Sequence, residues 1–489
     1  MQTDRSQTSP PWNFSHSYAE LPGSFYAHAT PVNATAPQLV LLNRRLLETL
    51  GIAPEHFPLE VAASVFSGNT LPTGANPIAQ AYAGHQFGHF TMLGDGRAIL
   101  LGEHVAPDGK RFDIQLKGAG RTPYSRRGDG LAALGPMLRE YIISEAMHAL
   151  GIPTTRSLAV VLTGEAVMRE QPLPGAVLTR VAESHLRVGT FEFAAATGKP
   201  ELLKALADYT LQRHFPECME SHNPYLAMLQ AVMERQASLV SQWMLVGFIH
   251  GVMNTDNMAI GGQTIDYGPC AFMDEFSVHT VFSSIDHQGR YAYGNQPRIA
   301  QWNLARFAET LLPLLHADRE EATRLAEIEI LSFPALYQRY WLTGMRAKLG
   351  LPNAEEGDTA LAESLLTCMQ LAKADFTNTF AGLSGAQKPV VFDDAIFGDW
   401  YERWLERASR QPGGVEAARA RMQTVNPVVI PRNHLVEEAL LQAESEGNLE
   451  ATIALIEVLA QPYTLPKEPE HYCTLPEPSK RVYQTFCGT

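Results

Sequence analysis

Two short acidic stretches lie close together in the chain. The first, "HGVMNTDNM", places Asp256 beside Asn257, and "IDYG" shortly after it contains Asp266. Each could be a turn in which Asp and Asn bind nearby backbone groups. They also match a kinase-type site, in which one aspartate is the base while an asparagine and a second aspartate hold Mg²⁺ through hard oxygen atoms. The Asp–Asn spacing is shorter than in HRDxxxxN, which argues against an ordinary protein kinase.

Lys117 lies at the end of "FDIQLKG", where apolar and polar residues alternate as in a β-strand. Lysines on strands are usually solvated, but this one is followed by the predicted helix "PMLREYIISEAMHALG". A strand lysine held by a helix glutamate is how a kinase grips the α- and β-phosphates of ATP. The helix offers Glu140 and Glu145, and periodicity does not decide between them.

Glycine and arginine gather in three further places. In "LGDGRAILLGE" glycines surround an aspartate before a strand, so backbone amides could approach phosphate, although the motif is not GxGxxG and also suits a hairpin turn. "GAGRTPYSRRGDG" is either a surface loop or a loop over an anionic ligand, with candidates Arg121, Arg126 and Arg127. Arg180 and Arg187 flank "VAESHL", and their guanidinium groups could bind phosphate bidentately.

The stretch "GHQFGH" places His85 and His89 at positions i and i+4, as in a zinc-binding helix. Gln86 stands where HExxH has its glutamate, and Gly84 and Gly88 disfavour a helix. We interpret both histidines as structural or pocket-lining residues.

The elements that must position these residues change along the chain. Up to residue 80 we expect irregular structure and one short helix, "APQLVLLNRRLLETLG". Strands follow in "RAILLGEHV" and "RFDIQLKG", joined as a hairpin by "APDGK", and then in "SLAVVLTG" and "GAVLTRVA". Beyond residue 200 helices dominate, beginning with "YLAMLQAVMERQASLVSQWMLVGFIHG". Short strands are expected around "MAIGGQTIDYG", with a tight turn at Gly261–Gly262.

This order predicts an α+β fold with a strand-rich N-terminal lobe, a larger helical C-terminal lobe and a ligand cleft where they meet. The expected divisions are an N-terminal extension (1–80), an N-lobe with nucleotide-binding loops (81–200), a helical C-lobe with catalytic and metal-binding loops (201–465) and a tail (466–489).

Composition narrows the class of protein. A formal net charge of −14 over 489 residues disfavours a broad nucleic-acid-binding surface. The five cysteines form neither a disulfide framework nor a CxxC zinc motif. The first residues lack the pattern of a secretory signal, and no apolar run approaches the roughly 18 residues of a membrane span. We therefore expect a cytoplasmic protein that binds neither nucleic acid nor membrane.

Taken together, these motifs resemble those of the selenoprotein O family of pseudokinases, which transfer AMP to proteins. The resemblance rests on "YAGHQFG", "LGDGRAILLGE", "QLKGAGRTPYSRRGDG", "SEAMHALGIPTTRSL", "RVAESHLRVGTFE", "GVMNTDNMAI", "TIDYGPCAFMD" and "QPRIAQWNL". Weaker similarity continues through "NPVVIPRNHLVEEAL" to the terminal "CGT", so it covers nearly the whole chain.

The resemblance implies a bilobal protein-kinase-like fold that binds ATP in a flipped orientation, with the γ-phosphate buried and the α-phosphate facing the acceptor. It implies Mg²⁺ or Mn²⁺ as cofactor, ATP as substrate, and Ser, Thr or Tyr hydroxyls of proteins, the enzyme itself included, as acceptors. The matching nucleotide contacts are Gly94, Gly96, Arg97, Lys117, Asp129, Gly130, Arg180, Arg187 and Asp266. The family's ion pair matches Lys117 with Glu140, its metal ligands match Asn257 and Asp266, and its base matches Asp256.

The chain departs from the family pattern in two places. Before the glutamate helix it reads "LAALGPMLRE" where family members often have a basic, serine-rich stretch. Cys487 holds the place of the selenocysteine of some members, but "FSVHTVFSSID" lacks the cysteine that would pair with it, so we do not expect a disulfide switch. Because chain ends are seldom tied down, we expect Cys487 to be an exposed, mobile thiol.

Three other functions use the same residues: UMP transfer from UTP, phosphoryl transfer by a true kinase, and nucleotide sensing without turnover. The complete set of Asp256, Asn257 and Asp266 favours a catalyst over a binding module.

Overall fold

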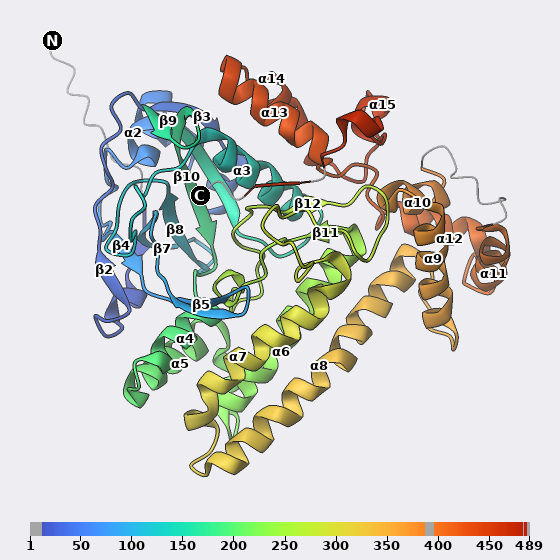
Figure 1. Ribbon diagram of the computed structural model, residues 1–489, viewed down its shortest axis with the longest axis horizontal. Coiled ribbons are helices and arrows are strands. Elements are labelled where there is room, and N and C mark those ends of the chain that lie inside the picture. The colour runs from blue at the N-terminus through green and yellow to red at the C-terminus, as the bar shows by residue number, and fades with distance from the viewer. Residues whose placement is uncertain (1–11, 387–395, 483, 487–489) are drawn as a thin grey trace.

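The N-terminal part of the protein is built on one antiparallel sheet. The computed structural model describes residues 12–386, 396–482 and 484–486 (Figure 1). Seven strands of the sheet follow the order β2-β4-β7-β8-β10-β9-β3, and β1 pairs with β7. Their bounds are β1 Phe14–Ser15, β2 Tyr26–His28, β3 Gln38–Leu42, β4 Ile78–Gln80, β7 Ala98–Val105, β8 Arg111–Lys117, β9 Arg156–Met168 and β10 Pro172–Ala182. The expected division at residue 80 stays a prediction; β2, β3 and β4, which precede it, are part of this sheet.

Alternation along the strands gives the sheet two buried faces. On β10, Val177 packs into the cluster under α2 (Leu59–Ser67), whereas its neighbour Leu178 packs into the larger cluster that contains α3 (Leu134–Ala149). On β8, Ile114 and Leu116 belong to the α2 side. Lys117 lies on the opposite face, as the alternation predicted, and there it contacts Glu140 of α3. The predicted β7–β8 hairpin and the strands β9 and β10 are confirmed.

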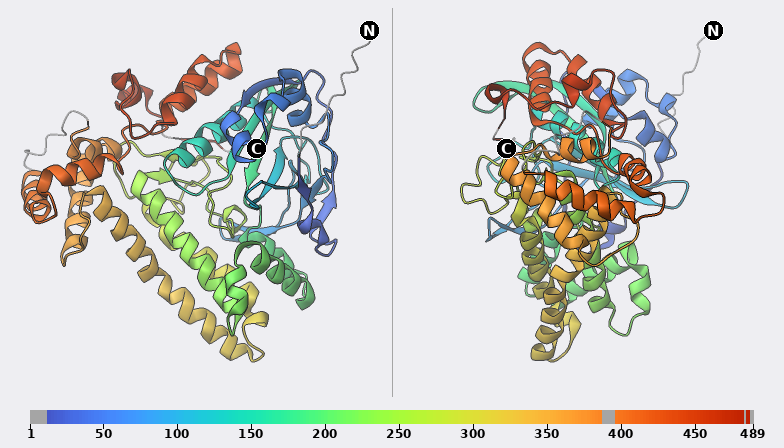
Figure 2. Two further views of the ribbon diagram at one scale, coloured as in Figure 1. Left: turned by 180° about the vertical axis from the view of Figure 1, so that it is seen from behind. Right: turned by 90° about the vertical axis from the view of Figure 1, so that its right-hand side faces the viewer.

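The rest of the chain is mainly helical, as expected. In the described residues these helices are α4 Val188–Ala196, α5 Pro200–His214, α6 Pro224–Val246, α7 Gln296–Leu315, α8 Arg319–Lys348, α9 Asp358–Ala372, α10 Phe376–Leu383, α11 Gly398–Ser409, α12 Gly414–Gln423, α13 Asn433–Glu446, α14 Glu450–Leu459 and α15 Pro469–Tyr472. Short 3₁₀ turns are η1 Ser17–Glu20, η2 Pro54–His56, η3 Pro216–Glu220, η4 Thr255–Asn257, η5 Tyr293–Asn295 and η6 Pro478–Lys480. Helices α6 and α8 run side by side, and α13 and α14 return to pack on α3 (Figure 2).

Two small ladders lie between the sheet and these helices. Strands β5 (Ala83–Gln86) and β6 (His89–Met92) form a hairpin, so His85 and His89 are on strands and not on a zinc-binding helix. Strands β11 (Phe248–Ile249) and β12 (Ala271–Phe272) pair with each other. This second ladder brackets the loop that carries both acidic stretches.

Two local predictions were wrong. The stretch 36–51 is not one helix: β3 pairs with β9, and α1 (Arg44–Thr49) begins only after Asn43, whose side chain accepts the Leu46 amide hydrogen as an N-cap. Residues 258–268 contain a turn at Gly262 but no strand of their own. Ala259 and Thr264 do not pair with each other; they form isolated bridges with Arg187 and Thr154.

Within the described ranges, no helix is both long enough and apolar enough to cross a membrane.

Candidate active site

Three cationic side chains converge on one carboxylate, Asp266. Its Oδ1 accepts hydrogen bonds from Lys117 Nζ at 3.2 Å and from Arg180 Nη2 at 2.7 Å, while Oδ2 accepts from Arg187 Nη1 at 2.7 Å. Burial alone would raise the pKa of Asp266, but Arg180, Arg187 and Lys117 hold it well below its usual value. The backbone of Asp266 is left-handed, with φ at 62°, which is uncommon for a residue other than glycine and is frequent at functional sites.

The helix glutamate that pairs with Lys117 is Glu140. Lys117 Nζ donates to Glu140 Oε2 at 2.6 Å, and Arg180 Nε donates to Oε1 at 2.7 Å. Although burial opposes ionisation, Arg180 and Lys117 keep the pKa of Glu140 below its usual value. The other candidate, Glu145, binds Arg156 in an ion pair of 2.7 Å, away from Lys117. The structure thus resolves the alternative that periodicity left open.

Asp256 lies in the same site but is poorly solvated. It is 6% exposed, its Oδ1 has no hydrogen-bond partner among the described residues, and Oδ2 receives only a long 3.4 Å bond from Gln86 Nε2. Burial raises its pKa from an ordinary 3.8 to about 6, against the lowering effect of Arg187. A Cβ atom at Gly84 would lie 2.3 Å from Asp256 Oδ1, so only glycine allows this approach of β5. A carboxylate with a pKa near 6 is suited to act as a base near neutral pH.

Hydrogen bonds fix the loop that presents Asp256. Glu192 on α4 accepts from Thr255 Oγ1 at 2.6 Å and lies 2.5 Å from His85 Nδ1, and the His85 amide donates to Thr255 Oγ1 at 2.7 Å. Asn254 Oδ1 accepts from the Tyr291 hydroxyl at 2.6 Å. His85 is therefore structural, as expected.

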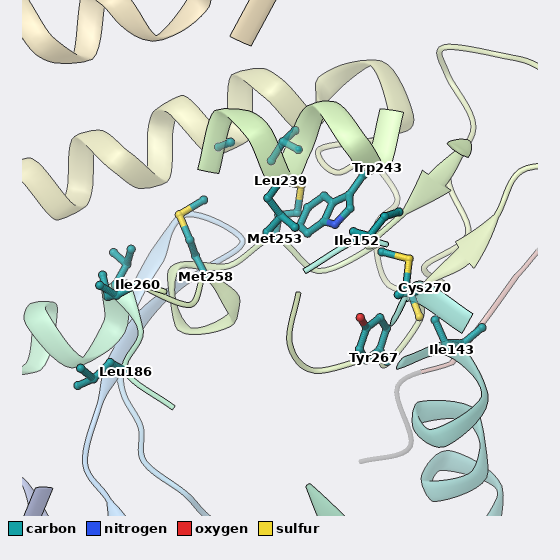
Figure 3. Packing of buried hydrophobic residues seen from close by; sticks show 14 of the residues in the cluster. Ile143, Ile152, Leu186, Leu239, Trp243, Met253, Met258, Ile260, Tyr267 and Cys270 are labelled. Atoms are coloured by element: carbon teal, nitrogen blue, oxygen red, sulfur yellow. The ribbon is translucent and has the colours of Figure 1, made fainter. Parts of the chain in front are cut away.

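Apolar side chains anchor the same loop to the core (Figure 3). Met253 and Met258, on either side of Asp256, are buried in the cluster that also contains Trp243 of α6. Tyr267, next to Asp266, is in this cluster as well. Both acidic turns are thus held by the core, which limits their movement relative to each other.

These residues line a cavity of about 570 Å³ between the sheet and the helical part. Its walls include Gly96, Arg97, Lys117, Arg180, Arg187, Asp256, Asn257 and Asp266. A neighbouring hollow of about 520 Å³ shares Tyr82, Gly96 and Arg97 with it and is lined by Arg127, Asp129 and Gly130 as well. The structure therefore brings together nearly all the residues that the motifs suggested.

The exceptions are few. Gly94 lines neither hollow; a Cβ there would collide with the ring of Tyr124. Asp129 lines the smaller hollow, but it is exposed and forms an ion pair of 2.8 Å with Arg169. Arg121 and Arg126, candidates for an anionic ligand, are exposed and line neither hollow.

The donor set fits a hard divalent cation. Asn257 donates from its amide nitrogen to Val252 O at 3.0 Å, and its side chain lines the cavity with Asp266. Within the described part of the chain, no three His, Cys, Asp or Glu side chains cluster as a metal cage. Mg²⁺ is commonly held by one or two side chains together with substrate phosphates, so two oxygen donors in a phosphate-sized cavity suffice.

Sequence reasoning missed Asp95 as part of the site. It is 2% exposed, accepts from the Gln80 amide at 3.1 Å and from Gln115 Nε2 at 3.2 Å, and lies 3.9 Å from Arg187. The available signal was its position inside "LGDGR", a motif considered only for its glycines. Burial raises the pKa of Asp95, despite the opposing effect of Arg187.

The C-terminal tail reaches this region. Cys487 lies outside the described residues, so its exposure stays a prediction. Thr485, two residues earlier, is fully buried, bonds Phe282 O through its amide at 2.7 Å and bonds Pro269 O through its hydroxyl at 2.6 Å. The described end of the chain is therefore packed against the loop that follows Asp266.

Comparison with known proteins finds one family. The profile of the family described as "Protein adenylyltransferase SelO" matches residues 11–460. A protein of Brevibacillus brevis named "Protein nucleotidyltransferase YdiU" is 60% identical over 490 residues, covering 100% of both chains. Proteins of the same name from Geobacillus kaustophilus and Bacillus cereus are 60% and 58% identical over 480 residues, covering 98% of this chain and 99% and 98% of theirs.

Proposed function

Because the chain belongs to the SelO family and is a protein nucleotidyltransferase, we propose that the group it transfers is AMP. ATP is the donor, and Ser, Thr or Tyr hydroxyls of proteins, its own included, are the acceptors. The convergence of Lys117, Arg180 and Arg187 on the cavity wall is the observation that carries this proposal. Three clustered cations match the charge of a triphosphate.

Their burial supports a flipped ATP. Arg180 and Arg187 are 1% and 3% exposed, and Lys117 is 8% exposed. An adenine ring at this end would have to pack against charged side chains, whereas the terminal phosphates would gain two guanidinium forks and an ammonium group. The α-phosphorus then lies farther out, within reach of an acceptor hydroxyl.

Asp256 is the proposed base. It takes the proton of the acceptor hydroxyl while that oxygen bonds to the α-phosphorus, and the bond from the α-phosphorus to the bridging oxygen breaks. Pyrophosphate leaves with the electron pair of the broken bond, and Lys117, Arg180 and Arg187 stabilise its charge. Asn257 and Asp266 would hold Mg²⁺ or Mn²⁺, which when bound neutralises charge that develops on the phosphates.

The arrangement also supports a bilobal kinase-like fold. A sheet lysine paired with a glutamate of α3 on one side, and an asparagine and an aspartate on loops of the helical part on the other, are the parts that a kinase site combines. The ladder of β11 and β12 closes the loop that carries the second group.

Labelled nucleotides test the proposal. With Mg²⁺ and an acceptor protein, α-labelled ATP should mark the acceptor and the enzyme, whereas γ-labelled ATP should not. Label from the γ position alone would establish a kinase instead. α-Labelled UTP belongs in the same experiment, because the relatives' name "nucleotidyltransferase" does not specify the base; preference for UTP would replace AMP by UMP. Nucleotide binding without any transfer would leave a sensing module.

A further inference from the structure

Besides the hollow that contains Asp129, another hollow adjoins the catalytic cavity. It measures about 620 Å³ and shares Phe87 and Ile285 with the cavity that contains Asp256. Its walls come from the β5–β6 turn, the loop 285–290 and the first turns of α7, which contribute Arg298 and Trp302. We call it the acceptor groove. Its position beside the proposed base makes it the route by which a protein hydroxyl can reach the site.

The charge of the groove is opposite to that of the chain. Arg290 and Arg298 line it, and within the described residues neither has a carboxylate partner in an ion pair. Elsewhere arginines such as Arg156 and Arg213 meet carboxylates at close range. The protein as a whole carries a formal charge of −14, so the two arginines give this groove a charge of the opposite sign.

Among the described residues of the groove wall, the one carboxylate does not offset this positive charge on the solvent side. Asp286 is 6% exposed, and its two oxygens accept the backbone amides of Arg290 at 2.9 Å and Tyr291 at 2.8 Å. It is bound inward and shapes the loop. The arginine side chains are therefore the charged groups that an incoming ligand would meet.

The groove is preformed and has an apolar floor. The Arg290 guanidinium lies 4.9 Å from the centre of the Trp302 ring, and Ile285 is 54% exposed. Tyr291, which follows Arg290, bonds Asn254 in the loop of the proposed base. Thr485 pairs with the strand-like segment just before Ile285 through Ser284 N, at 3.0 Å. Binding here needs little reordering of the protein.

We propose that this groove binds the acceptor as an extended segment that carries Asp or Glu beside the modified hydroxyl. The carboxylates pair with Arg290 and Arg298, and an apolar side chain covers Trp302 and Ile285. This inference rests on the proposed function, because it supplies the acceptor class for that reaction. Nucleic acid is disfavoured as an occupant, because the rest of the surface would repel it.

Synthetic peptides with one serine and flanking aspartates, compared with the same peptides carrying asparagine, test the proposal on the full-length protein with ATP and Mg²⁺. We expect the acidic peptide to react with a kcat/KM about tenfold higher, since an exposed ion pair contributes up to about fivefold and two arginines act. The preference should shrink at high salt, because exposed charges are screened. Equal rates for the two peptides would overturn the proposal.

Charge reversal provides the second arm. Arg298→Glu and Arg290→Glu should each abolish the preference, because each variant leaves one arginine beside one glutamate. Arg44→Glu makes the same charge change at an exposed position of α1, which contributes nothing to the groove, and should keep wild-type preference. Arg298 is exposed, so its variant should fold even if the Arg290 variant, which loses the contact with Trp302, does not. A preference that survives in Arg298→Glu overturns the assignment.

Binding separates this inference from the proposed function. Fluorescence polarisation of the labelled acidic peptide, with a non-hydrolysable ATP analogue present, measures groove occupancy without turnover. Tight binding that Arg298→Glu weakens supports the groove even if no AMP is transferred, an outcome that would refute only the proposed reaction. AMP transfer to proteins combined with no charge-dependent peptide binding would refute only the groove.

Discussion

Replacing Asp256 by Asn should make the protein more stable while it destroys transfer. The carboxylate is buried with one oxygen unpartnered, and its pKa is about 6 instead of 3.8. Each pKa unit corresponds to about 1.4 kcal/mol, so keeping the charged form in the folded state costs about 3 kcal/mol at pH 7.5. Asn mimics the neutral form, but its new amide nitrogen lacks an acceptor, and we expect a net gain of about 1–2 kcal/mol in the free energy of unfolding.

The pH dependence follows from the direction of the shift. Because the folded protein raises this pKa, the penalty is nearly absent below pH 4, grows as the carboxyl loses its proton, and is constant above about pH 7. The advantage of Asp256→Asn should therefore shrink by half or more at pH 5 relative to pH 7.5 in urea unfolding. Asp399→Asn, at an exposed position, should change stability by no more than about 0.5 kcal/mol at either pH.

Transfer by Asp256→Asn should fall on the order of 10²–10⁴-fold with ATP affinity unchanged, as expected for loss of a base. Two results would refute the argument that burial of the charged Asp256 carboxylate destabilises the fold. One is a variant that is less stable than wild type at pH 7.5, and the other is a gain in the free energy of unfolding that is the same at pH 5 and pH 7.5.

Three further substitutions test the rest of the site. Asp266→Ala should retain or tighten ATP binding without metal, because the cations are released to the phosphates. Mg²⁺ should no longer improve ATP binding, and transfer should be lost. Calorimetry with and without Mg²⁺ measures this, and an Mg²⁺ effect on ATP binding that persists would contradict the assignment of Asp266 as a metal ligand. Arg180→Lys keeps the positive charge but loses the bidentate hydrogen bonds of the guanidinium group, and should weaken ATP binding about 10–100-fold in direct titration. An affinity equal to that of wild type would show that Arg180 does not bind the phosphates. Gly84→Ala places a Cβ 2.3 Å from Asp256 Oδ1, and should lower kcat on the order of 10²-fold with ATP affinity nearly intact; normal turnover would show that the position of Asp256 is not critical.

The sequence could predict those parts of the site that depend on residues close together in the chain, but not those set by contacts between distant segments. The alternation in "FDIQLKG" correctly placed Lys117 on the face opposite Ile114 and Leu116, and the structure shows that α3 covers that face. It could not choose between Glu140 and Glu145, which are about 140° apart around a helix, because the choice depends on how the helix is rotated on the sheet. That rotation is set by packing of α3 on β9 and β10 and by the returning α13 and α14, which no local pattern encodes.

The same limit explains the missed and mistaken elements. Asp95 entered the site through bonds to Gln80 and Gln115, residues brought to it by sheet pairing. Residues 258–268 looked like a hairpin, yet their backbone groups are satisfied by residues as distant as Thr154 and Arg187. In contrast, the change from β3 to α1 at Asn43 could have been predicted from the sequence, because asparagine is a preferred N-cap residue and marks where a helix can begin.

The ion pairs around Asp266 bear on how substrate and metal are received. The same nitrogen atoms that would bind a triphosphate are paired with Asp266 in this structure. They belong to Lys117, Arg180 and Arg187. A triphosphate that takes these cations frees both Asp266 oxygens, and the carboxylate can then bind a hard cation. Without nucleotide, a cation must compete with three positive side chains, and without metal, nucleotide must compete with Asp266. The two partners should therefore assist each other's binding by the same factor, as linkage requires.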